Sequence, residues 1–401
     1  MPSIYLHIPF CKSRCAYCDF FSTTQLSRRE AYVDALCKEA KRRLSTLNSQ
    51  LSTLNSQPST LNPISTIYFG GGTPSLLSPD QIARILQAIN APQAIEVTLE
   101  ANPGDLTPDY LRAIREAGVN RLSIGIQSFD DEVLRRIGRR HTAAEAKAAV
   151  KAAQAAGFDN ISIDLIYGIP SQLSTLNISP DRSGRTRTLN SQRSTLNTQL
   201  LSAWEAQIEQ ALQLGVQHIS TYCLSYEEGT RMTRMLEQGE ITEVDEDTEN
   251  AMYDLLVSQL IKAGFEHYEV SNFALPGYRS RHNSSYWNRT HYIGLGAGAH
   301  SYDGARTRSW NPDNLEEYIR AMERGEDAAA CETLTDTDLY NERIMLGLRT
   351  AEGIALSELH NPALAQPYIE RSLLQETADR RLTATISGIH ILNRIIEDLM
   401  E

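Results

Sequence analysis

Short apolar runs alternate with helical patterns through most of the first 225 residues. Six runs have the length and composition of β-strands, at 3–8, 65–69, 94–100, 121–126, 160–167 and 218–224. Three of the helical patterns between them carry start and stop signals. The segment 79–89 follows the candidate N-cap Ser78, 108–117 begins at Pro108 and ends before Gly118, and 141–156 ends before Gly157. This alternation predicts βα units and a parallel sheet.

Six βα units are too few for a closed eight-fold barrel. The pattern therefore predicts an α/β fold in which residues 1–235 form an open or partial (β/α)6 barrel. In such folds, ligands bind where the carboxyl ends of the strands meet. We expect the polar and glycine residues that follow each strand to line the functional site.

Two stretches interrupt this alternation. A seven-residue unit is repeated in tandem over 44–62, and pieces of it return within 171–199. Its leucines keep the spacing of a coiled coil, but Ser, Thr and Asn are weak helix formers and the run is shorter than three heptads. We interpret both stretches as polar low-complexity insertions, the first on the face away from the site and the second on the face of the site.

The pattern changes after residue 225. An amphipathic helix is expected over 249–263, and we interpret 236–334 as a linker and haem- or substrate-site region. A capping pattern at Thr335 and Asp338 then precedes a helical segment at 339–348. The tail after Arg380 has the pattern of a short strand or wing and a final helix. Residues 335–401 are thus predicted to form a mostly helical, winged-helix-like module.

The chain has 401 residues, of which 41% are hydrophobic, and a formal net charge of −12. This charge argues against a nucleic-acid partner. No run approaches the ~18 apolar residues of a membrane span, and the apolar stretch near the N-terminus is too short for a signal peptide. We expect a cytoplasmic protein with reduced cysteines, and peripheral membrane contact is left open. Cys37, Cys223 and Cys331 are scattered and are expected to be ordinary buried thiols.

Cys11, Cys15 and Cys18 form a CxxxCxxC loop directly behind the first predicted strand. Structural zinc usually has four ligands from two CxxC pairs, and the sequence has no second pair. A zinc-binding interaction module therefore stays an alternative only. A [4Fe–4S] cluster held by three cysteines would keep one iron open for a substrate or cofactor.

The neighbours of these cysteines suit a cluster. Lys12 and Arg14 place positive charge beside the thiols, and we expect them to lower the thiol pKa values. Tyr17 and Phe20 are expected to shield the cluster from water.

The loop, with an aromatic residue before its third cysteine, resembles that of the radical S-adenosylmethionine (SAM) superfamily, whose partial barrel also matches the βα count. The GGGTP segment at 70–74 strengthens this resemblance. The resemblance implies that SAM chelates the open iron through its amino and carboxylate groups. It also implies that an electron donor reduces the cluster, which then cleaves SAM to a 5′-deoxyadenosyl radical.

Further stretches resemble the oxygen-independent coproporphyrinogen III oxidase-like proteins, namely 5–11, 68–77, 100–106, 121–141, 163–170 and the C-terminal module. By position, this resemblance implies that Tyr5, Gly71 and Glu100 contact the SAM on the cluster. It also implies a further SAM-contacting pocket formed by Tyr17, Gly72, Thr73, Gln127, Arg139 and Asp164.

Two functions compete within this family. In the family's oxidases, which decarboxylate porphyrinogen propionates, the cysteine loop has the form CxxxCxxCxC and follows a longer N-terminal arm. This chain has Phe20 at the position of the last of those cysteines. The radical SAM haem chaperones have an apolar residue there and an HNxxYW stretch, which is present at 282–287. The resemblance therefore favours a haem chaperone that binds a [4Fe–4S] cluster, SAM and haem and delivers haem to apo-haemoproteins. Coproporphyrinogen oxidation is the alternative.

The 282–301 region offers candidate haem contacts. His282 is the candidate axial ligand, and a loop histidine bonded to the backbone is the alternative. His300 is a second, weaker candidate. The GLGAGAHS segment at 294–301 resembles a dinucleotide fingerprint only loosely and does not lie in a βαβ unit. The sequence assigns no catalytic residue.

Overall fold

The computed structural model describes residues 1–55, 64–170 and 186–401. These residues form a twelve-stranded sheet in the order β12-β11-β10-β9-β1-β2-β3-β4-β5-β6-β8-β7. Its centre consists of parallel strands in sequence order, namely β1 (Ser3–Ile8), β2 (Thr66–Gly71), β3 (Glu96–Ala101), β4 (Arg121–Gln127), β5 (Ile161–Tyr167) and β6 (His218–Cys223). Each lies within two residues of a predicted strand. The predicted α/β partial barrel is confirmed.

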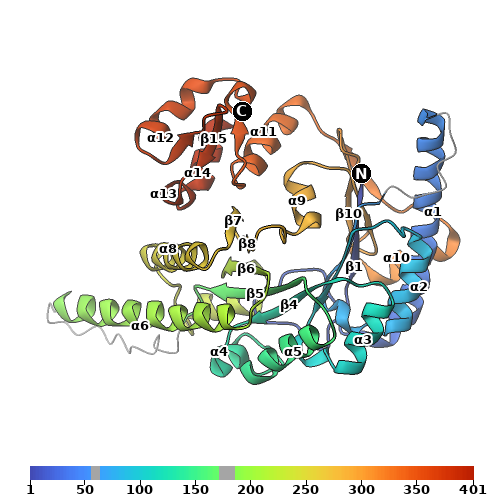
Figure 1. Cartoon of the computed structure of the whole chain (residues 1–401), viewed down its shortest axis with the longest axis horizontal. Coiled ribbons are helices and arrows are strands. Elements are labelled where there is room, and N and C mark those ends of the chain that lie inside the picture. The colour runs from blue at the N-terminus through green and yellow to red at the C-terminus, as the bar shows by residue number, and fades with distance from the viewer. Residues whose placement is uncertain (56–63, 171–185) are drawn as a thin grey trace.

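Helices cover the outer face of these strands (Figure 1). They include α1 (Arg29–Asn55), α2 (Pro79–Ile89), α3 (Pro108–Glu116), α4 (Asp131–Arg136), α5 (Ala143–Ala155), α6 (Thr186–Gln213) and α8 (Glu246–Lys262). The predicted start signals act as caps: the Ser78 hydroxyl accepts from the Gln81 N–H and forms a capping box, and the Thr107 hydroxyl accepts from the Tyr110 N–H. None of the helices in the described ranges is long and apolar enough to cross a membrane.

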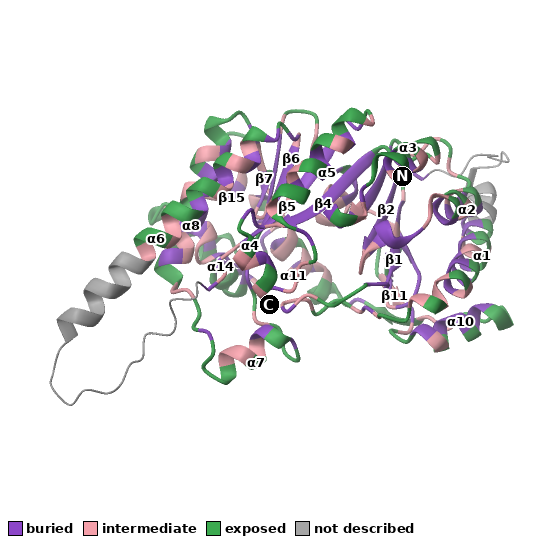
Figure 2. Ribbon diagram, turned by 90° about the horizontal axis from the view of Figure 1, so that it is seen from below, coloured by how far each residue is buried: buried purple, intermediate pink, exposed green. Residues whose placement is uncertain are grey.

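The main core lies between the strands and these helices. Strands β1 to β5 are almost entirely buried, whereas the outward faces of the helices are exposed (Figure 2). The core also receives side chains from helices α8 and α10 (Leu315–Arg324). Burial of this apolar surface fixes the orientation of each strand, so that the carboxyl ends of β1 to β6 meet at one edge.

The start of the first repeat belongs to α1, which differs from our expectation of a purely polar insertion. Leu44 and Leu47 are 2% and 9% exposed and pack in the main core, because their spacing continues the apolar face of the helix. The remainder of this stretch, at 56–62, lies outside the described residues. Of the second stretch, 171–185 lies outside them as well, and 186–199 falls within α6.

The stretch 236–334 extends the sheet at both edges. On one side β8 (Asn272–Ala274) pairs antiparallel with β6 and with β7 (Glu266–Glu269). On the other side β9 (Tyr292–Leu295) pairs parallel with β1. Strands β10 (His300–Tyr302), β11 (Thr307–Trp310) and β12 (Ala330–Thr333) follow in antiparallel order, and the connections include α7 (Arg231–Glu237) and α9 (Arg281–Trp287).

The C-terminal module has its own apolar core and stands apart from the barrel helices (Figure 1). It contains α11 (Asp336–Gly347), β13 (Ile354–Ala355), α12 (Gln366–Glu370), β14 (Leu374–Glu376), β15 (Arg381–Ala384), α13 (Ile386–Ile389) and α14 (Leu392–Leu399). The Thr335 capping box, the strand after Arg380 and the final helix agree with the predicted winged-helix-like module. Glu342 of α11 forms ion pairs with Arg289 and Arg308 of the sheet region.

Candidate functional site

A cavity of about 550 Å³ opens at the carboxyl ends of β1 to β6, the edge at which the sequence places the site. Its volume falls in the range of ~300–1,000 Å³ that is usual for small-ligand pockets. Of the predicted site residues, it brings together Cys11, Cys15, Cys18, Tyr17, Gly71, Gly72, Thr73, Glu100, Gln127, Arg139 and Asp164. Tyr5 and His282 do not line it.

The three clustered cysteines are free thiols on the loop after β1. The Cys11 sulfur accepts from the Thr73 hydroxyl at 3.5 Å, and the Cys15 sulfur accepts from Arg139 Nη1 at 3.5 Å. Within the described part of the chain, no three His, Cys, Asp or Glu side chains gather closely enough to hold a single metal ion. The thiols thus share one wall of the cavity without converging on one point.

The expected effect is present for Arg14, which lowers the pKa of Cys11, but it is smaller than the effect of burial. Burial raises the pKa of Cys11 and raises that of Cys18 to about 11, and for Cys11 this outweighs the opposing charge of Arg14. Lys12 is ion-paired with an aspartate on another loop. The shielding residue also differs from our expectation: Phe20 is 67% exposed, whereas Tyr17 is partly buried in the cavity wall.

Two glycines at the end of β2 are required by close packing against β1 and the residue after it. Gly71 has φ +106°, and a Cβ there would lie 2.6 Å from the His7 ring. A Cβ on Gly72 would lie 2.8 Å from the carbonyl carbon of Pro9, which is backbone and cannot rotate away. This contact lets the end of β2 approach the segment that leads into the cysteine loop.

Two carboxylates face the cavity from strands on either side of β4: Glu100 near the end of β3 and Asp164 in the middle of β5. Glu100 accepts from the Tyr68 hydroxyl at 2.9 Å and from the Gly71 N–H at 3.2 Å. Burial raises its pKa to about 7, and the charge of Asp164 adds to this effect. Burial also raises the pKa of Asp164, which accepts from the Ser123 hydroxyl at 3.2 Å. Both groups can therefore bind hydroxyl or ammonium donors, and Glu100 can exchange a proton near neutral pH.

Arg139 and Gln127 complete the wall near β4. Arg139 donates to the Gly125 carbonyl and to the Cys15 sulfur, and its Nε is a buried donor for which the described residues provide no acceptor. Gln127 has φ +69°, at a bulge where the pairing of β4 with β5 shifts register. A non-glycine residue in the left-handed region is uncommon, and it often marks a functional site.

Tyr5 does not line the cavity, and its ring lies next to Gly70 of β2. Its hydroxyl bonds to His7 Nδ1 at 3.2 Å, and His7 Nε2 bonds to the Phe21 carbonyl at 2.9 Å. Because a carbonyl only accepts, Nε2 of His7 carries the proton and Nδ1 accepts from Tyr5. Tyr5 therefore supports the end of the cysteine loop through His7.

His282 is a fully buried residue of α9 and faces the barrel interior. Its ring nitrogens bond to the Thr66 hydroxyl at 2.8 Å and the Tyr286 hydroxyl at 2.9 Å, and the ring stacks on Tyr68. Burial lowers its pKa to about 3. This arrangement supports neither an axial haem ligand nor a histidine bonded to the backbone. His300 is exposed and stacks on Trp310.

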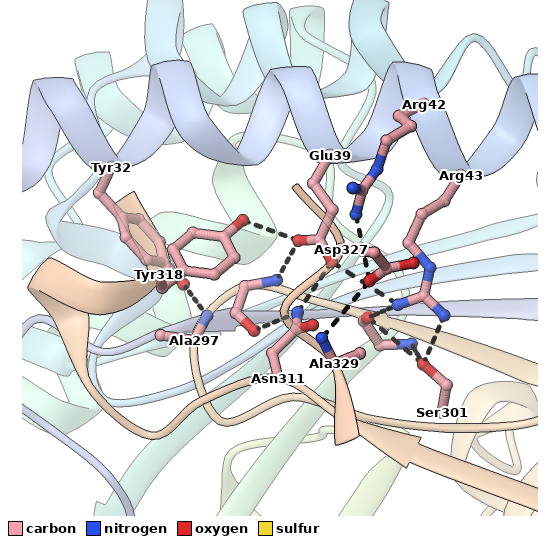
Figure 3. Close-up of polar contacts among 12 residues, drawn as sticks. Tyr32, Glu39, Arg42, Arg43, Ala297, Ser301, Asn311, Tyr318, Asp327 and Ala329 are labelled. Carbon is pink, nitrogen blue, oxygen red and sulfur yellow. Dashed lines mark hydrogen bonds and ion pairs between the residues drawn. The ribbon is translucent and has the colours of Figure 1, made fainter. Parts of the chain in front are cut away.

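The GLGAGAHS segment has a structural explanation. Figure 3 shows the carboxylate of Glu39, which is buried on α1 and accepts from the Gly296 N–H at 2.8 Å, the Asn311 amide at 2.8 Å and the Tyr318 hydroxyl at 2.7 Å. Tyr32 accepts from the Ala297 N–H and donates to the His7 carbonyl. The segment is thus anchored between α1, α10 and β1, away from the cavity.

Several cavity residues were missed by sequence reasoning. Asn102, Ser123 and Tyr222 line the cavity, and each is a polar residue in a predicted strand or within two residues of its end, which is the signal that could have identified them. Cys223 lines the cavity as well and is exposed, as is Cys331, so the prediction of buried thiols is wrong for both. Nothing in the spacing of isolated cysteines distinguishes these cases.

A partial barrel with three cysteines on the loop after its first strand is the arrangement of radical SAM proteins, and a family model described as "Radical SAM superfamily" matches residues 5–173. Heme chaperone HemW of Lactococcus lactis is 34% identical over 365 residues, which cover 90% of this chain and 84% of that protein. The mitochondrial radical S-adenosyl methionine domain-containing protein 1 of Danio rerio is 31% identical and covers 99% of this chain and 86% of its own length. The chain belongs to the radical SAM superfamily and, within it, to the family of these HemW-type proteins.

The fold also matches a solved structure. Coproporphyrinogen III oxidase (HemN) from Escherichia coli superimposes with a TM-score of 0.75 at 21% identity, covering 100% of this chain and 90% of that chain. At this identity, the match shows a shared fold. It extends from the barrel through the C-terminal module.

Proposed function

We propose that this protein is a haem chaperone that binds a [4Fe–4S] cluster, SAM and haem, and that it delivers haem to apo-haemoproteins. The cavity that joins three free thiols to Glu100, Asp164 and Arg139 is the observation that carries the cluster and SAM part. The haem part is supported by the relatives named heme chaperone HemW and by Phe20 at the position of the oxidases' further cysteine.

The residues present fit a cluster and SAM. Three free thiols on one loop that line the cavity are the ligands of a [4Fe–4S] cluster with one open iron, whereas structural zinc usually has four protein ligands. The unpaired Nε of Arg139 offers a donor for a ligand carboxylate, and the two buried carboxylates offer acceptors for an ammonium or hydroxyl. When bound, the cluster supplies an electron to SAM, and an electron donor is therefore an expected partner.

The oxidase alternative would place a heavier demand on the cations of the cavity. An oxidase must hold several propionate carboxylates, and these need free cations. Among the described residues that line the cavity, the cations are Arg14, Arg139 and Arg140, and each already donates to a protein acceptor, namely the Ser22 carbonyl, the Gly125 carbonyl and an aspartate. Of these cations, Arg139 keeps a free donor, its Nε, for one ligand carboxylate.

Anaerobic reconstitution tests the proposal at three points. Iron and sulfide in the ratio of a [4Fe–4S] cluster, lost in a Cys15→Ser variant, are expected; stoichiometric zinc instead would refute the cluster. SAM titration should perturb the cluster spectrum, and Arg139→Met should weaken that response. Haem-loaded protein should transfer haem to an apo-haemoprotein, and formation of protoporphyrinogen from coproporphyrinogen III would favour the oxidase.

A further inference from the structure

Asp105 connects three loops around the cavity. It ends the short helix η3 (Pro103–Asp105) after β3, and its side chain is only 5% exposed. Its carboxylate accepts from Lys12 Nζ at 2.9 Å, from the Ser75 hydroxyl at 3.0 Å and from Arg140 Nη2 at 3.2 Å. A nearly buried carboxylate with three donors from separate segments is a strong local constraint.

Each partner of Asp105 lies next to, or two residues from, a residue that carries or contacts one of the cysteine thiols. Lys12 directly follows Cys11 in the cysteine loop. Ser75 is two residues after Thr73, whose hydroxyl donates to the Cys11 sulfur, and Arg140 follows Arg139, which donates to the Cys15 sulfur. One carboxylate therefore ties together the three segments that surround the thiols.

The hydroxyl of Ser75 is oriented for this role. It accepts from the Asn102 N–H at 3.1 Å, so its own proton points to Asp105. Lys12 is 48% exposed, and a single pair with such a lysine would contribute little. The second cation and the buried hydroxyl make the network stronger than one exposed ion pair.

We propose that Asp105 is a positioning residue that holds three segments together: the cysteine loop, the segment of Thr73 and Ser75 that follows β2, and the segment of Arg139 and Arg140. This inference rests on the proposed function, because it concerns the cluster that the thiols would hold. It assigns to Asp105 no contact with the cluster or with SAM. Its effect passes through Lys12, Ser75 and Arg140.

The test compares Asp105→Asn with Asp109→Asn after anaerobic reconstitution. Asparagine keeps the shape but loses the charge, and Asp109 is an 89% exposed neighbour on α3 that serves as the matched control. We expect Asp105→Asn to lose iron to a chelator about tenfold faster than wild type, the factor of one hydrogen bond to a charged group. The EPR signal of the reduced cluster with SAM should also broaden in Asp105→Asn, whereas that of Asp109→Asn should match the wild type.

A double-mutant cycle with Lys12→Met follows the effect to its partner. Lys12→Met should accelerate iron loss in the wild-type background and add little to the effect of Asp105→Asn.

If wild type takes up no cluster, the proposed function fails. If wild type takes up the cluster and Asp105→Asn behaves like Asp109→Asn, this inference alone is overturned. Should Asp105→Asn not fold, Lys12→Met and Ser75→Ala replace it, and iron loss at the wild-type rate in both would overturn the inference.

Discussion

Replacing Glu100 by glutamine should stabilise the SAM-free protein above neutral pH. The pKa of Glu100 is raised from 4.5 to about 7, chiefly by burial. The folded state therefore binds the proton more tightly than the unfolded state, and the wild type loses stability as the pH rises from about 4.5 through about 7. At about 1.4 kcal/mol per pH unit, the cost reaches about 3 kcal/mol at pH 8 and about 1 kcal/mol at pH 5. Glutamine carries no charge and avoids this cost.

Glutamine can keep both hydrogen bonds of Glu100. Its amide oxygen can accept from the Gly71 N–H, and its amide nitrogen can donate to the Tyr68 hydroxyl, which accepts as well as donates. The substitution therefore removes the charge with little change in packing. Its gain in stability should appear mainly above pH 5.

Urea unfolding of the SAM-free protein at pH 5 and pH 8 measures this difference. We expect the free energy of unfolding of Glu100→Gln to exceed that of wild type by about 3 kcal/mol at pH 8 and by about 1 kcal/mol at pH 5. Glu227→Gln, an exposed carboxylate at the cavity rim, is the control and should change neither value. A gain that is equal at the two pH values, or a loss at pH 8, would refute the reasoning.

Three further substitutions test the packing described above. Gly72→Ala should destabilise the protein by about 1–3 kcal/mol because its Cβ meets backbone, whereas Gly104→Ala, whose Cβ has no atom nearer than 3.6 Å, should be nearly neutral in urea unfolding; equal effects would contradict this. His282→Ala should cost about 2–4 kcal/mol by leaving the buried Thr66 hydroxyl and the partly buried Tyr286 hydroxyl unpaired, with haem affinity unchanged in titration, and a lost Soret shift would restore the ligand hypothesis. Glu342→Ala should cost about 1–3 kcal/mol and expose the C-terminal module to limited proteolysis, because it leaves two arginines without their counter-charge; unchanged cleavage would refute this.

The parallel strands and the cavity edge could be predicted because each is set by local patterns. A run such as 161–167 has strand composition and a turn signal on both sides, and the order of βα units decides where the carboxyl ends meet. The positions of Glu100, Asp164 and Arg139 at one cavity follow from this order together with the family resemblance. The strand-end signal identifies Glu100, whereas Asp164 in the middle of β5 and Arg139 between α4 and α5 needed the family resemblance.

Other features depend on contacts between distant segments. His282 has the chemistry of a haem ligand, but its partner Thr66 lies 216 positions away, and no pattern near His282 shows that the ring is buried. From the sequence, Asp105 is indistinguishable from an ordinary turn residue. Its role is evident only in the fold, where Lys12, Ser75 and Arg140 donate to its carboxylate. The addition of β9 to the sheet is equally non-local.

The pairing of β1 with β9 sets the order in which the protein can mature. β1, which leads into the cysteine loop, is synthesised before the other strands of the sheet, but its neighbour on one side begins only at Tyr292. Until then β1 is an unpaired edge, and such edges recruit other chains. The strand that leads into the cysteine loop therefore gains its second neighbour only late in translation. Iron delivered to a nascent chain before that point would reach a cysteine loop whose supporting sheet is incomplete.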